Sequence, residues 1–282
     1  MYYGIGKTSK TKNLRLIKEF RETIARARET HELLLFWENR PKQGMNMPPE
    51  INTLASTLTS LRIIGDTLPT IPSALLLLSR LTKLVVQNCK VTAMPENMEP
   101  WQELEILEFQ DNELIHIPRS IMALKKLKRL NLRTNHLTDI PPGVCSLPVL
   151  EELILDNNRI AVLPKKLVLM TKLKTLRLTR NLLTELPDGI GHLKSLELFY
   201  CNSNKLTWLP DEIGDLPNLR ELRLGFNQIA KLPEEFGEGA LAKRYHEFIF
   251  SFNSMTEYFT NLMIYYLMII IFAKYCFTLA LQ

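Results

Sequence analysis

The stretch LKTLRLTRNLLTELPDGIGHLKS, residues 173–195, decides the fold because its pattern recurs every 23 residues. Counted from Leu173 as place 1, apolar residues stand at places 1, 4, 6, 11, 14, 18 and 21, with Asn at place 9 and Pro at place 15. A fixed period of this size indicates a solenoid, in which one structural unit is stacked on copies of itself. We therefore expect a protein that displays a binding surface rather than an enzyme. The prolines are Pro72, Pro95, Pro118, Pro141, Pro164, Pro187, Pro210 and Pro233, and the repeats begin at Leu58, Leu81, Leu104, Leu127, Leu150, Leu173, Leu196 and Leu219.

Each repeat is predicted to hold one short strand and one short helical turn. The segment L-x-x-L-x-L alternates with a period of two, which is typical of a strand with its leucines inward. The segment that follows the proline has apolar residues three apart, as in Ile190 and Leu193, and this spacing suits a helical or 3-10 turn. The proline fixes φ and ends the turn that leaves the strand.

The Asn column at place 9 is predicted to be structural. A buried amide can both donate to and accept from the backbone of adjacent coils, so it would satisfy peptide groups that a tight bend leaves without partners. Asp66 and Cys89 stand at this place in the first two repeats. Their side chains satisfy the backbone groups less completely than an amide does, so we expect the first coils to be looser. The column comprises Asn112, Asn135, Asn158, Asn181, Asn204 and Asn227.

Over residues 58–241 this pattern resembles the 23-residue leucine-rich repeat of the Ras-suppressor-like class. It resembles equally the plant intracellular Ras-group relatives and the arrays of basolateral-polarity scaffolds. The resemblance implies an α/β repeat fold: a curved horseshoe with parallel strands on the concave face, short helical or 3-10 segments on the convex face, and an N-terminal helix. It also implies an intracellular signalling adaptor that binds a protein partner on the concave face, some members acting beside small GTPases or phosphatases.

The distribution of charge and the cysteines indicate which cellular compartment and which class of partner to expect. The net charge of +5 lies mostly in residues 1–50, and the array itself holds 22 residues of each sign. A nucleic-acid groove needs a basic stripe of one sign, so a nucleic-acid partner is not expected. The four cysteines form no C-x-x-C pair and no clusters at the ends of the array, and residues 1–13 lack the apolar core of a secretory signal. We expect a cytoplasmic protein.

The N-terminal residues 1–57 are predicted to cap the array. Apolar residues recur at helical spacing over 13–38, from Leu14 through Phe20 to Leu34, which predicts an amphipathic helix. Residues 47–54 then resemble the convex half of a repeat. The alternative is a basic amphipathic helix for a membrane or a partner, against which its five acidic residues argue.

The C-terminal residues 242–282 are predicted to hold a degenerate ninth repeat and a hydrophobic tail. With a slip of three residues, Phe248, Phe250 and Asn253 fit places 4, 6 and 9. The tail carries twelve consecutive apolar residues, 262–273, within the wider span 258–281. Three alternatives remain for it: a membrane anchor that would tether the array to a bilayer, a buried cap, or an alternative or mispredicted terminus.

No catalytic, cofactor or metal-binding residues are predicted. Residues 4–8, GIGKT, end like a phosphate-binding loop, but Met1 stands where the first glycine belongs and no strand can precede it. The five histidines show no metal-ligand spacing with cysteine or carboxylate residues. Cys201 falls at an inward place, where a thiol behaves as a small hydrophobe.

The concave face is the candidate binding site, formed by places 3, 5, 7 and 8 of each repeat, which point away from the core. Arg and aromatic residues commonly dominate interface energetics, so the preferred patch contains Arg177, Arg180, Tyr200, Arg223 and Phe226. Eight strands about 4.8 Å apart would provide enough width for a standard protein interface. The predicted partner-binding residues are Glu108, Arg129, Glu152, Arg177, Arg180, Tyr200, Arg223 and Phe226.

Overall fold

A computed structural model describes residues 21–37, 49–65, 68–230 and 248–249. They belong to two compact units, Met1–Asn158 and Arg159–Gln282, here called the N-terminal and C-terminal units. The GIGKT motif, Asp66 and the hydrophobic tail lie outside the described residues, and the predicted division at 57 and 241 stays a prediction. Within the described ranges no helix has the length and apolar character needed to cross a bilayer.

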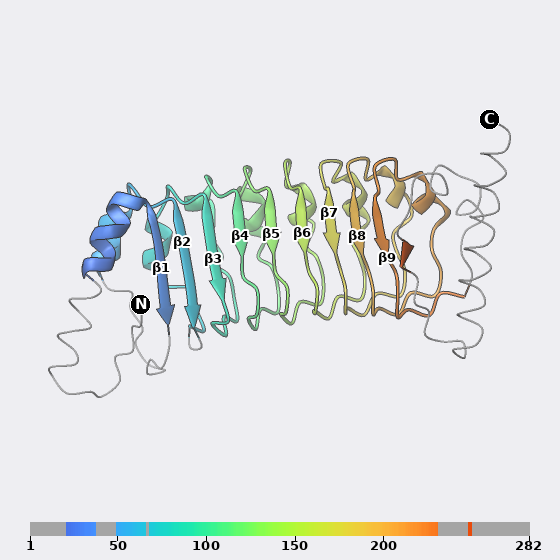
Figure 1. The fold of residues 1–282 in the computed structure, drawn as a ribbon, viewed down its shortest axis with the longest axis horizontal. Coiled ribbons are helices and arrows are strands. Elements are labelled where there is room, and N and C mark those ends of the chain that lie inside the picture. The colour runs from blue at the N-terminus through green and yellow to red at the C-terminus, as the bar shows by residue number, and fades with distance from the viewer. Residues whose placement is uncertain (1–20, 38–48, 66–67, 231–247, 250–282) are drawn as a thin grey trace, which may run out of the picture. The chain divides into compact units, whose positions relative to one another are not determined.

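The described part of the N-terminal unit contains six parallel strands that pair in sequence order (Figure 1). Equivalent places of successive repeats lie side by side, as Ser60 opposite Lys83 and Lys83 opposite Ile106 show. The register therefore follows the period of the sequence, and the inward leucines stack upon one another. The strands are β1 (Glu32–Trp37), β2 (Ser60–Gly65), β3 (Lys83–Gln87), β4 (Ile106–Glu108), β5 (Arg129–Asn131) and β6 (Glu152–Ile154).

The C-terminal unit continues the same pattern with β7 (Thr175–Arg177), β8 (Leu198–Tyr200) and β9 (Glu221–Arg223). A further strand, β10 (Phe248–Ile249), pairs in parallel with β9, Phe248 lying opposite Leu222. Both residues occupy place 4 if the ninth repeat is displaced by three residues, and the ninth repeat itself stays a prediction. The rest of that repeat lies outside the described residues.

Short 3-10 helices follow the prolines and lie on the other face of the coils from the strands (Figure 1). Pro72, Pro118, Pro164 and Pro210 each stand directly before such a helix in extended conformation, with φ between −69° and −60°. The prolines thus make the turn that the sequence predicted. The helices are η1 (Pro49–Leu54), η2 (Ser73–Leu77), η3 (Glu99–Trp101), η4 (Arg119–Ala123), η5 (Val144–Ser146), η6 (Lys165–Leu169), η7 (Ile190–His192) and η8 (Asp211–Asp215).

The N-terminal helix is shorter than predicted, because the end of the expected span 13–38 forms a strand. The described residues form a helix over 21–30, and β1 then pairs with β2. Leu33 and Leu35 are buried while Leu34 is 43% exposed, which is the alternation of a strand and not of a helix. His31 marks the change: its φ of 59° breaks the helix, and its carbonyl accepts from the amides of Thr59 and Ser60.

The half-repeat proposed for residues 47–54 corresponds to η1 (Pro49–Leu54). Ile51 and Leu54 are fully buried there, as Ile121 is in η4 and Leu167 is in η6. Burial of an aliphatic side chain stabilises a fold by about 1.5–3 kcal/mol. These two side chains therefore cover the end of the leucine stack that begins at Leu58.

The core is a stack of buried leucines, with larger residues where the sequence departs from leucine. Phe109 and Phe199 are buried at inward strand places. Trp101 is also buried, and its indole Nε1 donates to the Leu75 carbonyl of the preceding coil at 3.0 Å. This bond satisfies the polar atom of a ring that otherwise packs as a hydrophobe.

The Asn column is buried and bonds as predicted. Asn135 accepts at Oδ1 from the Leu114 amide (3.0 Å), and its Nδ2 donates to the carbonyls of Phe109 (2.9 Å) and Leu132 (3.0 Å). Leu114 and Phe109 belong to the preceding coil, so each amide seals the turn of the coil before its own. In the C-terminal unit Asn204 repeats this arrangement with Leu183, Leu178 and Cys201.

The residue at place 8 adopts a left-handed conformation in the repeats from Leu81 onward. Its φ lies between 55° and 58°, and in five of these residues the amide donates to the place-7 carbonyl of the following coil, as from Asp111 to Arg133 at 2.9 Å. Asn and Asp tolerate this conformation, whereas other side chains adopt it at a cost of about 1–2 kcal/mol. The column comprises Asn88, Asp111, Thr134, Asn157, Arg180, Ser203 and Phe226.

We predict that Asn135→Ala lowers the free energy of unfolding by about 1–3 kcal/mol, because a buried amide and two carbonyls lose partners. Asn218→Ala is the matched control, since Asn218 is exposed and its Nδ2 makes one bond to the Lys194 carbonyl. Urea denaturation followed by circular dichroism measures both. Equal losses in the two variants would contradict a special role for the column.

We also predict that Gly191→Ala destabilises the chain by about 1–3 kcal/mol through overpacking. A Cβ atom at Gly191 would lie 2.5 Å from the carbonyl oxygen of Glu212 on η8, which is part of the backbone and cannot rotate away. Gly143→Ala should cost less, because its Cβ would meet Ile121 Cγ2 at 3.3 Å. Thermal unfolding compares the two; a Gly143→Ala loss as large as that of Gly191→Ala would refute this account.

Candidate functional site

The predicted binding residues lie on the strand face of the two units and at the strand ends that follow. Glu108, Arg129 and Glu152 belong to β4, β5 and β6 of the N-terminal unit. In the C-terminal unit, Arg177, Tyr200 and Arg223 lie on β7, β8 and β9, and Arg180 and Phe226 stand at place 8 beyond β7 and β9. Their role in partner binding stays a prediction.

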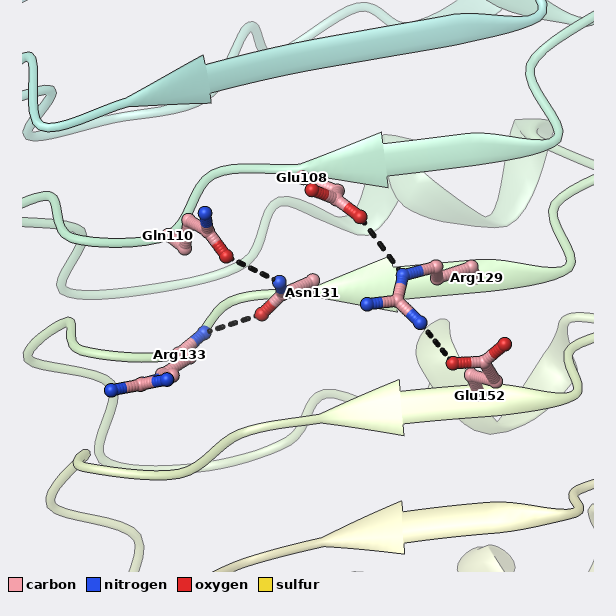
Figure 2. Close-up of polar contacts among 6 residues, drawn as sticks. All are labelled: Glu108, Gln110, Arg129, Asn131, Arg133 and Glu152. Carbon is pink, nitrogen blue, oxygen red and sulfur yellow. Dashed lines mark hydrogen bonds and ion pairs between the residues drawn. The ribbon is translucent and has the colours of Figure 1, made fainter. Parts of the chain in front are cut away.

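In the N-terminal unit the charged residues pair with one another. Arg129 lies between two carboxylates from the neighbouring strands: its Nε contacts Glu108 Oε1 at 2.8 Å, and its Nη1 contacts Glu152 Oε2 (Figure 2). The Glu108 side chain is only 16% exposed, so solvent screens this pair less than a surface pair. A partner would have to break or add to a completed triad here.

The next rows of this unit are also joined by side-chain hydrogen bonds. Asn131 Nδ2 donates to Gln110 Oε1 at 2.6 Å, and the Arg133 amide donates to Asn131 Oδ1 at 3.2 Å (Figure 2). Nearer the N-terminus, Arg62 Nη2 donates to Gln87 Oε1 at 3.1 Å. The strand face of this unit therefore presents polar groups that already hold one another in place.

The formal charge of this face is zero. Among places 3, 5, 7 and 8 of the repeats that begin at Leu58, Leu81, Leu104, Leu127 and Leu150, four residues are basic and four are acidic. The basic residues are Arg62, Lys83, Arg129 and Arg133, and the acidic residues are Glu108, Asp111, Glu152 and Asp156.

In the C-terminal unit three of the predicted residues form one cluster around an aromatic ring. Arg177, Tyr200 and Arg223 are opposite one another on adjacent strands. The guanidinium carbons of Arg177 and Arg223 lie 5.2 Å and 5.0 Å from the centroid of the Tyr200 ring. Both distances fall within the range of a cation–π contact, about 6 Å. Two positively charged guanidinium groups thus contact the same Tyr200 ring.

Glu221 completes this cluster, although it was not among the predicted binding residues. Its Oε2 accepts from the Tyr200 hydroxyl at 2.5 Å, and its Oε1 contacts Arg223 Nε. Glu221 stands at place 3, diagonally across from Tyr200, so the strand register brings the two side chains near each other and their rotamers complete the contact. We call Arg177, Tyr200, Glu221 and Arg223 the Tyr200 cluster.

The cluster shifts the pKa values of its two acidic groups in opposite directions. The hydrogen bond from Tyr200 lowers the pKa of Glu221 below its ordinary value of 4.5, and Arg223 lowers it further, whereas burial opposes both effects. Burial raises the pKa of Tyr200 above its ordinary value of 10.0, and the hydrogen bond to Glu221 raises it further. At neutral pH the cluster therefore contains a carboxylate and a neutral phenol.

Arg180 and Phe226 lie outside the Tyr200 cluster and face solvent. Phe226 is 51% exposed, and Arg180 is exposed as well. Both adopt the left-handed conformation of place 8, with φ of 56° and 58°. The structure therefore divides the predicted patch into the Tyr200 cluster and two solvent-facing side chains.

No group of three or more His, Cys, Asp or Glu side chains is arranged to hold a metal ion in the portion of the chain that the structure describes. Cys89, Cys145 and Cys201 are buried, and none of them forms a disulfide with another described residue. Cys201 occupies an inward place beneath the strand face, as predicted.

Family comparisons agree with this geometry. A model described as a leucine-rich repeat region matches residues 114–238, and another described as a leucine rich repeat matches residues 79–137. The fold is a leucine-rich repeat solenoid. This outcome confirms the predicted fold class, and it confirms the resemblance at the level of the leucine-rich repeat. A comparison with curated proteins gives no match.

Solved leucine-rich repeat structures are similar to this chain. A leucine-rich repeat protein of Leptospira interrogans is 28% identical with a TM-score of 0.65, over 79% of this chain and 62% of that protein. The ectodomain of the Arabidopsis thaliana receptor kinase GASSHO1/SCHENGEN3, solved in complex with CASPARIAN STRIP INTEGRITY FACTOR 2, is 26% identical with a TM-score of 0.62, over 78% of this chain and 26% of that one. This chain thus spans less than two thirds of either structure.

Internalin C2 of Listeria monocytogenes shares the fold alone. It is 22% identical with a TM-score of 0.59, over 72% of this chain and 84% of that protein. Leucine-rich repeat domains generally mediate protein–protein interactions, and they are typically scaffolds without enzymatic activity.

We predict that Tyr200→Phe raises the pKa of Glu221 toward 4.5, because the variant removes the hydrogen bond that contributes most to lowering it. NMR titration of carbon-13-labelled glutamate carboxyl groups in both proteins measures the shift. Because the folded-state pKa is depressed, ionised Glu221 stabilises the fold above about pH 4.5, and this contribution is lost as the pH falls through the folded-state pKa. Glu221→Gln should remove that part of the acid sensitivity; an unchanged pKa in Tyr200→Phe would contradict the assignment.

Proposed function

We propose that this chain is a non-enzymatic adaptor that binds a protein partner on the strand face of its leucine-rich repeats. The observation that carries the proposal is the Tyr200 cluster with its neighbours Arg180 and Phe226. Arg, Tyr and Phe are residue types that commonly anchor protein interfaces, and here adjacent strands present them on one face. The Arabidopsis receptor ectodomain, a structural neighbour, was solved in complex with CASPARIAN STRIP INTEGRITY FACTOR 2, which supports the use of this fold for binding.

We also propose that the chain is related to the Ras-suppressor-like class and that it resides in the cytoplasm. The regular 23-residue period supports a relationship to the Ras-suppressor-like class, whose members act as intracellular signalling adaptors beside small GTPases or phosphatases. The four cysteines form no C-x-x-C pair and no clusters at the ends of the array, which supports a reducing, cytoplasmic environment.

We predict that the partner cross-links to the strand face and not to the face of the 3-10 helices. A photoreactive benzoylphenylalanine placed at Arg133 or Ser203 samples the strand face of each unit, and Ser203 occupies a place that is aromatic in the next coil, at Phe226. Matched probes at Met122 and Leu169, which are 47% and 66% exposed, sample the helical face.

Irradiation of cells that produce each full-length variant, followed by mass spectrometry, identifies the cross-linked proteins. The expected result is a protein captured from Arg133 or Ser203 and absent from Met122 and Leu169. Capture from the helical positions alone would overturn the proposed binding face.

A further inference from the structure

The strand face of the C-terminal unit carries an excess of positive charge. Places 3, 5, 7 and 8 of the repeats that begin at Leu173, Leu196 and Leu219 hold Arg177, Arg180 and Arg223 against a single acid, Glu221. The formal charge of these twelve places is therefore +2, whereas the corresponding face of the N-terminal unit is neutral. A net positive formal charge favours a ligand of the opposite sign.

The one carboxylate of this face is already used within the Tyr200 cluster. Its two oxygens contact the Tyr200 hydroxyl and Arg223 Nε. Arg180 is exposed, and across the described ranges its guanidinium forms no ion pair or hydrogen bond with another side chain. An arriving carboxylate could therefore bind Arg180 in a bidentate manner without displacing an existing partner.

Phe226 indicates that the ligand is not purely ionic. A phenylalanine with φ of 58° and 51% exposure gains little from burial and bears a conformational cost of about 1–2 kcal/mol. Asn88, Asp111 and Asn157 hold the equivalent place with residues better suited to it, and none of the other described coils has an aromatic residue there. Burial within the fold therefore contributes little at Phe226, and its exposed ring is available to contact an apolar side chain of a ligand.

We infer that the partner engages the C-terminal unit through an acidic segment, in which Asp or Glu side chains contact Arg180 and the Tyr200 cluster and an apolar residue packs against Phe226. This inference rests on the proposed function and names the chemistry of the partner at that face. Nucleic acid fits less well, because a phosphate backbone requires a basic stripe of one sign and Glu221 lies among these arginines.

Three fluorescent pools of twelve-residue peptides test the inference with the full-length chain. Each pool holds leucine, phenylalanine and alanine at fixed positions, and the remaining positions are Asp/Glu, Asn/Gln or Lys/Arg. Fluorescence anisotropy should show the acidic pool binding at least about tenfold more tightly than the amide pool, a difference of about 1.4 kcal/mol. High salt should reduce the difference in affinity between the acidic pool and the amide pool, and it should leave binding of the amide pool unchanged.

The variants separate this face from the overall charge. Arg180→Glu should weaken binding of the acidic pool about tenfold, whereas Lys166→Glu, the same charge change on the exposed part of η6, should not. Phe226→Asn should weaken binding too, while its thermal midpoint stays equal to or above that of the wild type, which excludes unfolding as the cause.

The inference is overturned by the absence of an acidic preference, by no binding of any pool, or by equal losses in Arg180→Glu and Lys166→Glu. Stronger competition by a single-stranded oligonucleotide than by the acidic pool would overturn it in favour of nucleic acid. If the Ser203 probe captures a partner while the acidic preference is absent, the proposed function stands and this inference fails. Capture from Met122 and Leu169 alone would overturn the proposed function itself.

Discussion

The structure depends on backbone groups of one coil being satisfied by the next. Parallel pairing at a constant offset joins the strands, and in the coils that carry Asn at place 9 the buried amide completes the turn of the coil before. An unsatisfied buried donor or acceptor costs about 1–3 kcal/mol, so a single coil could not adopt this path alone. Repetition is therefore a condition of the fold, and the constant period of the sequence expresses this requirement.

Because the core is the same in every coil, the coils differ mainly in what they present to solvent. The N-terminal unit uses its strand face for internal pairing, with Arg129 held by two glutamates. The C-terminal unit instead places two guanidinium groups against Tyr200 and leaves Arg180 and Phe226 facing solvent. One scaffold thus supports two surfaces with different chemistry, and the outward places alone account for the difference.

Features that depend on the 23-residue period could be predicted from the sequence, whereas a segment whose local pattern fits both a helix and a strand was predicted wrongly. Proline, leucine and asparagine spacing was sufficient for the strands, the 3-10 turns and the buried amides. Residues 32–37 were assigned to a helix because Leu34 continues a helical spacing, but pairing with β2 stabilises the strand. The contacts of Arg129 and the inclusion of Glu221 in the Tyr200 cluster depend on side-chain rotamers, which no spacing in one sequence specifies.

The bonds of the place-9 amides give each unit a direction. Asn227 binds the Leu206 amide and the Cys201 carbonyl, both in the coil before its own, and Asn112 likewise binds Cys89 and Val86 of the coil before it. A truncation from the N-terminal side would leave every remaining turn with its amide. A truncation from the C-terminal side would remove the amide that completes the last remaining turn. Shortening such an array should therefore lower its stability more from the C-terminal side than from the N-terminal side.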